Sequence, residues 1–393
     1  MKKILSLVIL LVSASLPSFA QKESFNPIYT GVTSLSIAPD ARAAGMGDVG
    51  AATDPDVNSQ YWNPAKYPFC ISRSGISLNY TPWLRQLVND IDLANITGYY
   101  RIGNYQALGG SLRYFSLGEV MLSDGSNTTI RPYEFSADVS YSMMLSETFS
   151  LGAAARFIYS DLAYKLDEDV TPGKSFAMDL AAYYNNYIML GSRECQLGLG
   201  LNISNIGSKI SYDEGNTEEF LPTNLRLGAS LMVPIDEYNT LSFSADANKL
   251  LVPTRPTMAQ YIKETGSDEK DYAGYNQWLE TTGYNDISPI KGIFKSFSDA
   301  PGGFKEEMEE IQWSVGAEYT YHNQFSIRAG YHHESESKGN RKYFTVGAGF
   351  RMNVFSLDAG YVISTAQSNP LDQTLRFSLA FDMDGIKDIF GKK

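Results

Sequence analysis

The sequence predicts an all-β chain, a fourteen-stranded antiparallel transmembrane β-barrel with an N-terminal plug segment. Three observations predict this fold class. Segments of about ten residues alternate between apolar and polar side chains, which is the period of a β-strand. The number of such segments is even, and the connections between them alternate between short and long. Outer-membrane barrels combine an even strand number with short turns at one end and long loops at the other.

The alternation is clearest in the C-terminal third of the chain. In the segment YFTVGAGFRM, Phe344 and Val346 share one face and Tyr343 and Thr345 share the other. Similar segments begin near residues 74, 92, 105, 134, 148, 176, 195, 224, 240, 312, 325, 343, 357 and 374. Most of them have the length of a tilted membrane strand, roughly 9–11 residues, whereas strands of soluble proteins usually have about five or six.

The connections predict the topology. Short ones are 103–104, 146–147, 323–324 and 353–356, and the main long ones are 117–133, 161–175, 205–223 and 250–311. The segment 186–194 is the exception, because it is longer than a periplasmic turn should be. We expect the barrel to span residues 74–383, with the long loops extracellular. Both termini are then expected in the periplasm, with 384–393 as a periplasmic tail.

Charged residues fall on the face opposite the apolar rows. They are Arg113, Asp138, Arg156, Asp179, Arg226, Asp246, Arg328, Arg351 and Arg376. Facing lipid, each would cost about 2–4 kcal/mol. We therefore expect them to line the lumen and to pair with each other there, rather than to act in gating or catalysis.

The N-terminus predicts export. Lys2 and Lys3 precede the apolar run ILSLVILLV, and Ser18-Phe19-Ala20 supplies a cleavage site, so residues 1–20 read as a signal peptide. Its removal takes the formal charge from −12 to −14 by two lysines, which argues against a nucleic-acid partner. Residues 21–73 are then an N-terminal periplasmic or plug segment.

A glycine-rich stretch inside that segment, GMGDVG at residues 45–50, matches the dinucleotide-binding spacing G-x-G-x-x-G. Such a loop needs a buried strand before it and a helix after it, because the helix N-terminus binds the pyrophosphate. Pro39 and Asp40 interrupt any strand before the glycines, and AATDPDVNSQYWNPAKYP after them has no helical apolar stripe. We therefore predict no nucleotide and no other cofactor.

The same stretch carries a resemblance. RAAGMGDVGAA followed by YWNPAKY, ahead of fourteen strands, resembles the FadL superfamily of outer-membrane barrels. The resemblance implies that both motifs belong to a plug inside the barrel. The plug-motif residues would be Gly45, Gly47, Gly50, Asn63 and Pro64, with the glycines at turns and close backbone contacts.

A narrower resemblance rests on the lead TGVTSLSIAPDARAAGMGDVGAATDPD and on the long-loop segment PIKGIFKSFSDAPGGFKEEMEEI. Together they resemble the PorV family of the type IX secretion system of Bacteroidetes. That resemblance implies an outer-membrane shuttle that takes cargo with a C-terminal secretion domain from a SprA/Sov-type translocon barrel. The cargo would pass to the PorU sortase and other attachment-complex proteins. The barrel itself would contact outer-membrane lipid and lipopolysaccharide.

Catalytic residues are scarce. Three histidines, His322, His332 and His333, show no zinc-binding spacing, and no G-x-S-x-G elbow is present. We predict no metal site and no enzyme. Two alternatives stay open: a FadL-like transporter of small hydrophobic molecules, and a lipid A O-deacylation factor, which the family resemblance suggests. Cys70 and Cys195 fall on distant strands, which favours two free thiols over a bridge.

The connection 250–311 is the strongest candidate for a functional surface, because loops of this length usually bind something or are disordered. Its apolar content argues against disorder, and DYAGYNQWLE and GFKEEMEEI read as short amphipathic helices. The loop either caps the barrel mouth or docks a partner, and the resemblance favours docking. The candidate partner- or cargo-binding residues are Tyr261, Tyr272, Tyr275, Trp278, Phe294 and Phe297.

Overall fold

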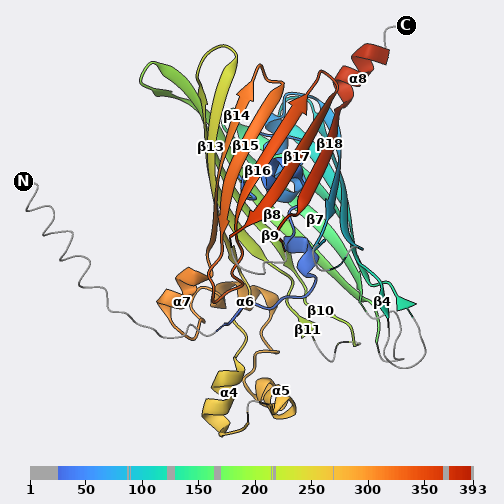
Figure 1. The fold of residues 1–393 in the computed structure, drawn as a ribbon, viewed down its shortest axis with the longest axis vertical. Coiled ribbons are helices and arrows are strands. Elements are labelled where there is room, and N and C mark those ends of the chain that lie inside the picture. Colours follow the sequence, from blue (N-terminus) through green and yellow to red (C-terminus); the bar gives the residue numbers. More distant parts are fainter. Residues whose placement is uncertain are drawn as a thin grey trace, which may run out of the picture.

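The computed structural model describes residues 25–390 except 86–87, 89, 122–128, 163–169, 214, 216–217, 269 and 366–370, so the predicted signal peptide lies outside it. Fourteen antiparallel strands form one closed barrel (Figure 1), and the predicted fold class is confirmed. The barrel strands are β1 Ser74–Pro82, β2 Ile91–Ile102, β3 Gln106–Leu117, β6 Tyr133–Ser146, β7 Phe149–Asp161, β8 Gly173–Leu190, β9 Arg193–Gly207, β12 Asn224–Pro234, β13 Asn239–Leu250, β14 Gln312–Tyr321, β15 Phe325–His333, β16 Lys342–Arg351, β17 Phe355–Ser364 and β18 Leu375–Asp382.

The first and last strands close the barrel, from the pair Gly75 and Asp382 to the pair Tyr80 and Phe377. One predicted connection, 186–194, is wrong. Strands β8 and β9 stay paired as far as Leu190 and Arg193. The alternating pattern therefore continues to a two-residue turn, and β8 and β9 are the longest strands of the barrel.

The two ends of the barrel differ. Short turns join the strands at one end, where α8 (Met383–Phe390) follows the last strand. Long connections gather at the other end, which we call the mouth (Figure 1). Elements at the mouth are β4 Val120–Met121, β5 Thr129–Ile130, β10 Ile210–Ser211, β11 Glu218–Glu219, α4 Met258–Thr265, α5 Tyr272–Thr281, α6 Pro289–Lys295 and α7 Phe304–Glu309.

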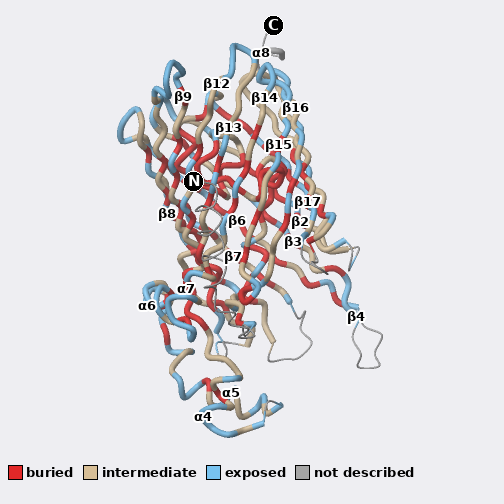
Figure 2. The backbone as a smooth tube through the Cα atoms, turned by 60° about the vertical axis from the view of Figure 1, so that its left-hand side comes forward, coloured by how far each residue is buried: buried red, intermediate tan, exposed pale blue. Residues whose placement is uncertain are grey.

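The lumen holds the N-terminal segment, here called the plug, with η1 Thr33–Ser36, α2 Ala41–Ala44, α3 Ser59–Trp62 and η2 Pro64–Phe69. Most plug residues are buried, because the barrel wall surrounds them (Figure 2). The wall alternates as predicted, with Tyr343 and Thr345 buried toward the lumen and Phe344 and Val346 exposed on the outside. Among the described residues, no helix has the length and apolar content needed to cross a membrane.

The plug enters from the mouth. Asn26 donates its backbone N–H to Ser337 O at 2.8 Å and its side-chain Nδ2 to Glu306 Oε1 at 2.9 Å, and both partners belong to mouth loops. The chain then crosses the lumen and leaves at the opposite end, where β1 begins. The first described residues therefore lie at the opposite end from α8, so for them the prediction that both termini lie on the same side of the membrane is wrong. The strand pattern carries no information on the direction in which the plug crosses the lumen.

Candidate functional site

Two of the plug-motif glycines, Gly45 and Gly47, lie against the barrel wall, whereas a Cβ on Gly50 would fall 2.2 Å from the Trp62 ring within the plug itself. Gly47 has a φ of +72°, and a Cβ there would fall 2.7 Å from the backbone oxygen of Tyr331. A Cβ on Gly45 would fall 2.9 Å from the Cα of Gly347. Glycine is needed here because backbone meets backbone. The wall contributes glycines of its own to this contact, namely Gly316, Gly330, Gly347 and Gly360.

Asn63 and Pro64 start helix η2. The Asn63 side chain accepts the Ala65 N–H at 3.1 Å, which caps the helix, and Pro64 occupies a first-turn position where its missing N–H costs little. The Asn63 amide also donates to Ala51 O at 3.0 Å and to Ala182 O at 2.9 Å. One side chain therefore joins the glycine-rich run, the second plug motif and strand β8.

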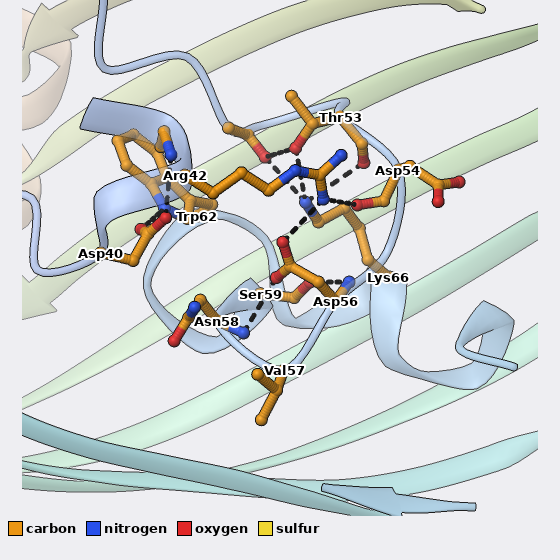
Figure 3. Close-up of polar contacts among 12 residues, drawn as sticks. Asp40, Arg42, Thr53, Asp54, Asp56, Val57, Asn58, Ser59, Trp62 and Lys66 are labelled. Atoms are coloured by element: carbon orange, nitrogen blue, oxygen red, sulfur yellow. Dashed lines mark hydrogen bonds and ion pairs between the residues drawn. The ribbon is translucent and has the colours of Figure 1, made fainter. Parts of the chain in front are cut away.

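Buried charged side chains hold the plug together (Figure 3) and tie it to the wall. Arg42 forms an ion pair with Asp56 at 2.8 Å and a second with Glu318 of β14 at 2.8 Å. Lys66 donates to Gly50 O at 2.9 Å and to both oxygens of Thr53. Because a buried ammonium is costly unless its donors are satisfied, this lysine fixes the turn at residues 50–53.

The charged lumen row pairs largely within itself and with the plug, the role predicted for it. Arg156 lies 3.3 Å from Asp138 and 2.9 Å from Asp179. Asp246 accepts the backbone N–H groups of Gly50 and Ala51 at 2.8 and 2.9 Å.

Two cavities lie on either side of the plug. The one toward the mouth has a volume of about 250 Å³ and is lined by Arg113, Arg226, Tyr61 and Trp62 among others. The one toward the short turns has about 110 Å³ and is lined in part by Arg351. The two share no lining residue. The plug separates them.

The sequence did not reveal that β14 and β15 bring Ser314 and His332 together. Ser314 Oγ lies 2.9 Å from His332 Nδ1, and the imidazole stacks on Tyr343 at 4.8 Å. Ser314 is only 1% exposed and lines neither cavity, so its hydroxyl is not accessible to a substrate in this structure. Within the described part of the chain, no cluster of His, Cys, Asp or Glu is suited to a metal ion, and Cys70 and Cys195 are free and buried.

Helix α7 anchors the long loop to the barrel. Glu307 reaches Lys249 at the end of β13 at 3.0 Å, and Glu306 reaches Lys338 of the neighbouring mouth loop at 2.6 Å. Glu310 contacts both lysines. These groups, with Asn26, tie the loop, two barrel hairpins and the start of the plug into one buried network. We call it the loop anchor.

An acidic side chain borders the loop anchor. Burial, together with the nearby carboxylates Glu307 and Glu310, raises the pKa of Asp299 to about 6. Its carboxylate accepts the Thr254 N–H at 3.0 Å.

Helices α4 and α5 form a small unit that projects from the mouth (Figure 1). Tyr261, Tyr275 and Trp278 pack together in it, with ring centroids 5.5–6.0 Å apart. Of the candidate docking residues, these three build the unit, whereas Tyr272, Phe294 and Phe297 are exposed. Sequence reasoning missed α4 and α6, although the Thr257–Gln260 capping box and Pro289 after the capping Ser288 mark their starts.

The family model described as "Type IX secretion system protein PorV" matches residues 19–257. The chain belongs to the PorV family. It is thus an outer-membrane component of the type IX secretion system, as the sequence predicted, and this family is one of secretion components rather than enzymes.

Solved structures of low identity resemble the chain. The TodX deltaS2S3 mutant monoaromatic hydrocarbon channel has a TM-score of 0.50 at 12% identity, over 87% of this chain and 98% of that one. The Ralstonia pickettii toluene transporter TbuX has 0.45 at 12%, over 92% and 98%. A Pseudomonas aeruginosa FadL homologue has 0.44 at 13%, over 91% and 100%. At 12% identity, the likeness to the TodX mutant shows a shared barrel fold and nothing more. No curated protein matches this PorV-family chain.

Proposed function

We propose that this PorV-family barrel is a shuttle. It takes cargo with a C-terminal secretion domain from the giant translocon barrel and delivers it to the sortase attachment complex. The mouth faces the cell exterior in this proposal, and the α4–α5 unit is the docking surface. The observation that supports it most is a folded, aromatic-rich unit projecting from a barrel whose own lumen is divided by the plug.

The geometry of the α4–α5 unit suits docking. Its aromatic core holds the two helices together. Tyr275 Oη of α5 also donates to the backbone oxygen of Pro256, just before α4, at 2.6 Å. Tyr272 on its outer side is 67% exposed. Large aromatic side chains on a rigid support are the residue type that contributes most to protein interfaces.

The plug across the lumen argues against transport of small hydrophobic molecules. The plug crosses the barrel and is held by buried ion pairs such as Arg42–Glu318. A ligand path would have to break such contacts, which are expensive to separate in a buried setting. The lumen row is also charged, which suits a polar contact surface better than an apolar solute.

Photo-crosslinking in living cells tests the shuttle proposal. A benzophenone side chain would replace Tyr272, and crosslinked proteins would be identified by mass spectrometry. We expect the translocon barrel, cargo and sortase. The matched control replaces Tyr105, a 60% exposed tyrosine at the short-turn end. Crosslinks to these proteins from position 105 alone would contradict docking at α4–α5.

A further inference from the structure

Helix α7 has its polar and apolar faces reversed relative to a soluble helix. The side chains of Glu307 and Glu310 are 8% and 0% exposed because they bind Lys249 in the loop anchor. Phe304 and Met308, one turn apart, are 81% and 51% exposed. A helix at an aqueous surface buries its apolar stripe and exposes its charges. The outer face of α7 is therefore suited to an apolar environment.

Helix α6 and the residues after it repeat the arrangement. Ile290, Phe294 and Phe297 lie four and three residues apart, so they follow one face, and all three are exposed. Gly292 is buried, where a Cβ would fall 3.1 Å from Phe220 and from Pro253. The glycine thus lets α6 pack closely on Phe220 and Pro253, while the aromatic side chains of this segment face outward.

The outer face of α7 continues into the lipid-facing wall. The helix ends at Glu309, and β14 begins three residues later at Gln312. Its side chains Trp313 and Val315 point outward. The Trp313 ring lies 5.5 Å from that of Tyr331, which lies 4.9 Å from Phe344 on the next strand. Aromatic clusters at strand ends mark the membrane interface.

We propose that α6 and α7 rest in the headgroup region of the membrane leaflet at the mouth, with their apolar side chains in lipid. Lys291 and Lys295 are exposed beside this row, and cationic side chains flanking an apolar face are typical of helices that bind anionic lipid surfaces. This assignment moves Phe294 and Phe297 from protein docking to lipid contact. It leaves α4–α5 as the part of the loop that extends away from the membrane.

Spin labelling of the full-length barrel in phospholipid nanodiscs containing phosphatidylglycerol tests the lipid contact. Nitroxides would be attached at Phe294→Cys and Met308→Cys, and their accessibility to oxygen and to a water-soluble nickel chelate compared. Tyr272→Cys on α5 is the control for water and Phe344→Cys on β16 the control for lipid. Cys70 and Cys195 are buried, and the unsubstituted chain measures their background labelling.

We expect positions 294 and 308 to match position 344, with high oxygen and low nickel accessibility. Values matching position 272 would overturn the proposal. So would shielding from both reagents, which indicates protein packing. The translocon is absent from the nanodiscs, so this result is independent of the shuttle proposal.

Discussion

Arg42 of the plug and Glu318 of β14 meet at two points inside the barrel, with Nη2 2.8 Å from Oε1 and Nε 3.2 Å from Oε2. Arg328 of β15 binds the same glutamate and also reaches Asp358 of β17 at 2.7 Å. Through the Glu318 carboxylate, the plug is therefore linked to strands β14, β15 and β17 of the wall. Such a plug is part of the folded barrel rather than a loosely held gate.

Arg42→Gln should destabilise the barrel. It leaves Asp56 and part of Glu318 without their buried partner, and breaking a buried ion pair from one side costs about 3–5 kcal/mol. Urea unfolding in detergent, followed by the shift in gel mobility, measures the change. The control Arg131→Gln removes an exposed pair with Glu119 and should leave the midpoint unchanged. Equal midpoints for the two variants would contradict the structural role of Arg42.

Gly330→Ala should displace the plug. The added Cβ would lie 2.1 Å from the backbone carbon of Met46, where backbone has to move. Overpacking of this kind costs about 1–3 kcal/mol and should open the lumen, seen as larger single-channel conductance in planar bilayers. Gly98→Ala adds the same methyl where its nearest neighbours are Gly75 and Ile76 rather than the plug. A conductance rise in Gly98→Ala, or none in Gly330→Ala, would count against this packing.

The contact of Asp299 with Thr254, beside the loop anchor, should weaken as pH rises. The pKa of Asp299 is raised from 3.8 to about 6, chiefly by burial. The folded loop then holds this proton more tightly than the unfolded loop, so the contribution of Asp299 to stability is fully present below about pH 4, falls up to about pH 6 and is level above it. Hydrogen exchange at the Thr254 amide, corrected for intrinsic rates, measures it. Asp299→Asn should flatten the profile, and rising protection from pH 4 to 6 would refute the sign.

An epitope tag inserted between the predicted cleavage site and Phe25 should be accessible to antibody on intact cells. The reason is that Asn26 is bound to Ser337 and Glu306 at the mouth, which we propose is extracellular. A tag after Lys393 should need permeabilised cells, because α8 lies at the other end. The reverse pattern would mean that the barrel is oriented the other way.

The sequence predicted the wall well because lipid on one side and lumen on the other impose a period of two. Every predicted strand start lies within three residues of the observed one. The pairing of Ser314 with His332 was within reach, since the turn at 322–324 sets the register of β14 and β15. The direction in which the plug crosses the lumen could not be predicted, because it depends on contacts between distant residues such as Asn26 and Ser337. The sequence also does not indicate that a single lumen glycine such as Gly330 packs against Met46.

Excision of the α4–α5 unit tests the central claim most directly. Tyr284 Oη lies 3.4 Å from Pro253 O, so the chain on both sides of residues 257–282 is close together and a short Gly/Ser linker can join it. The variant keeps α6, α7 and the loop anchor, and should fold and reach the outer membrane. Affinity purification in mild detergent should then recover the barrel without the translocon, sortase and cargo that accompany the intact chain. Unchanged recovery of those partners by the folded variant would contradict docking through α4–α5.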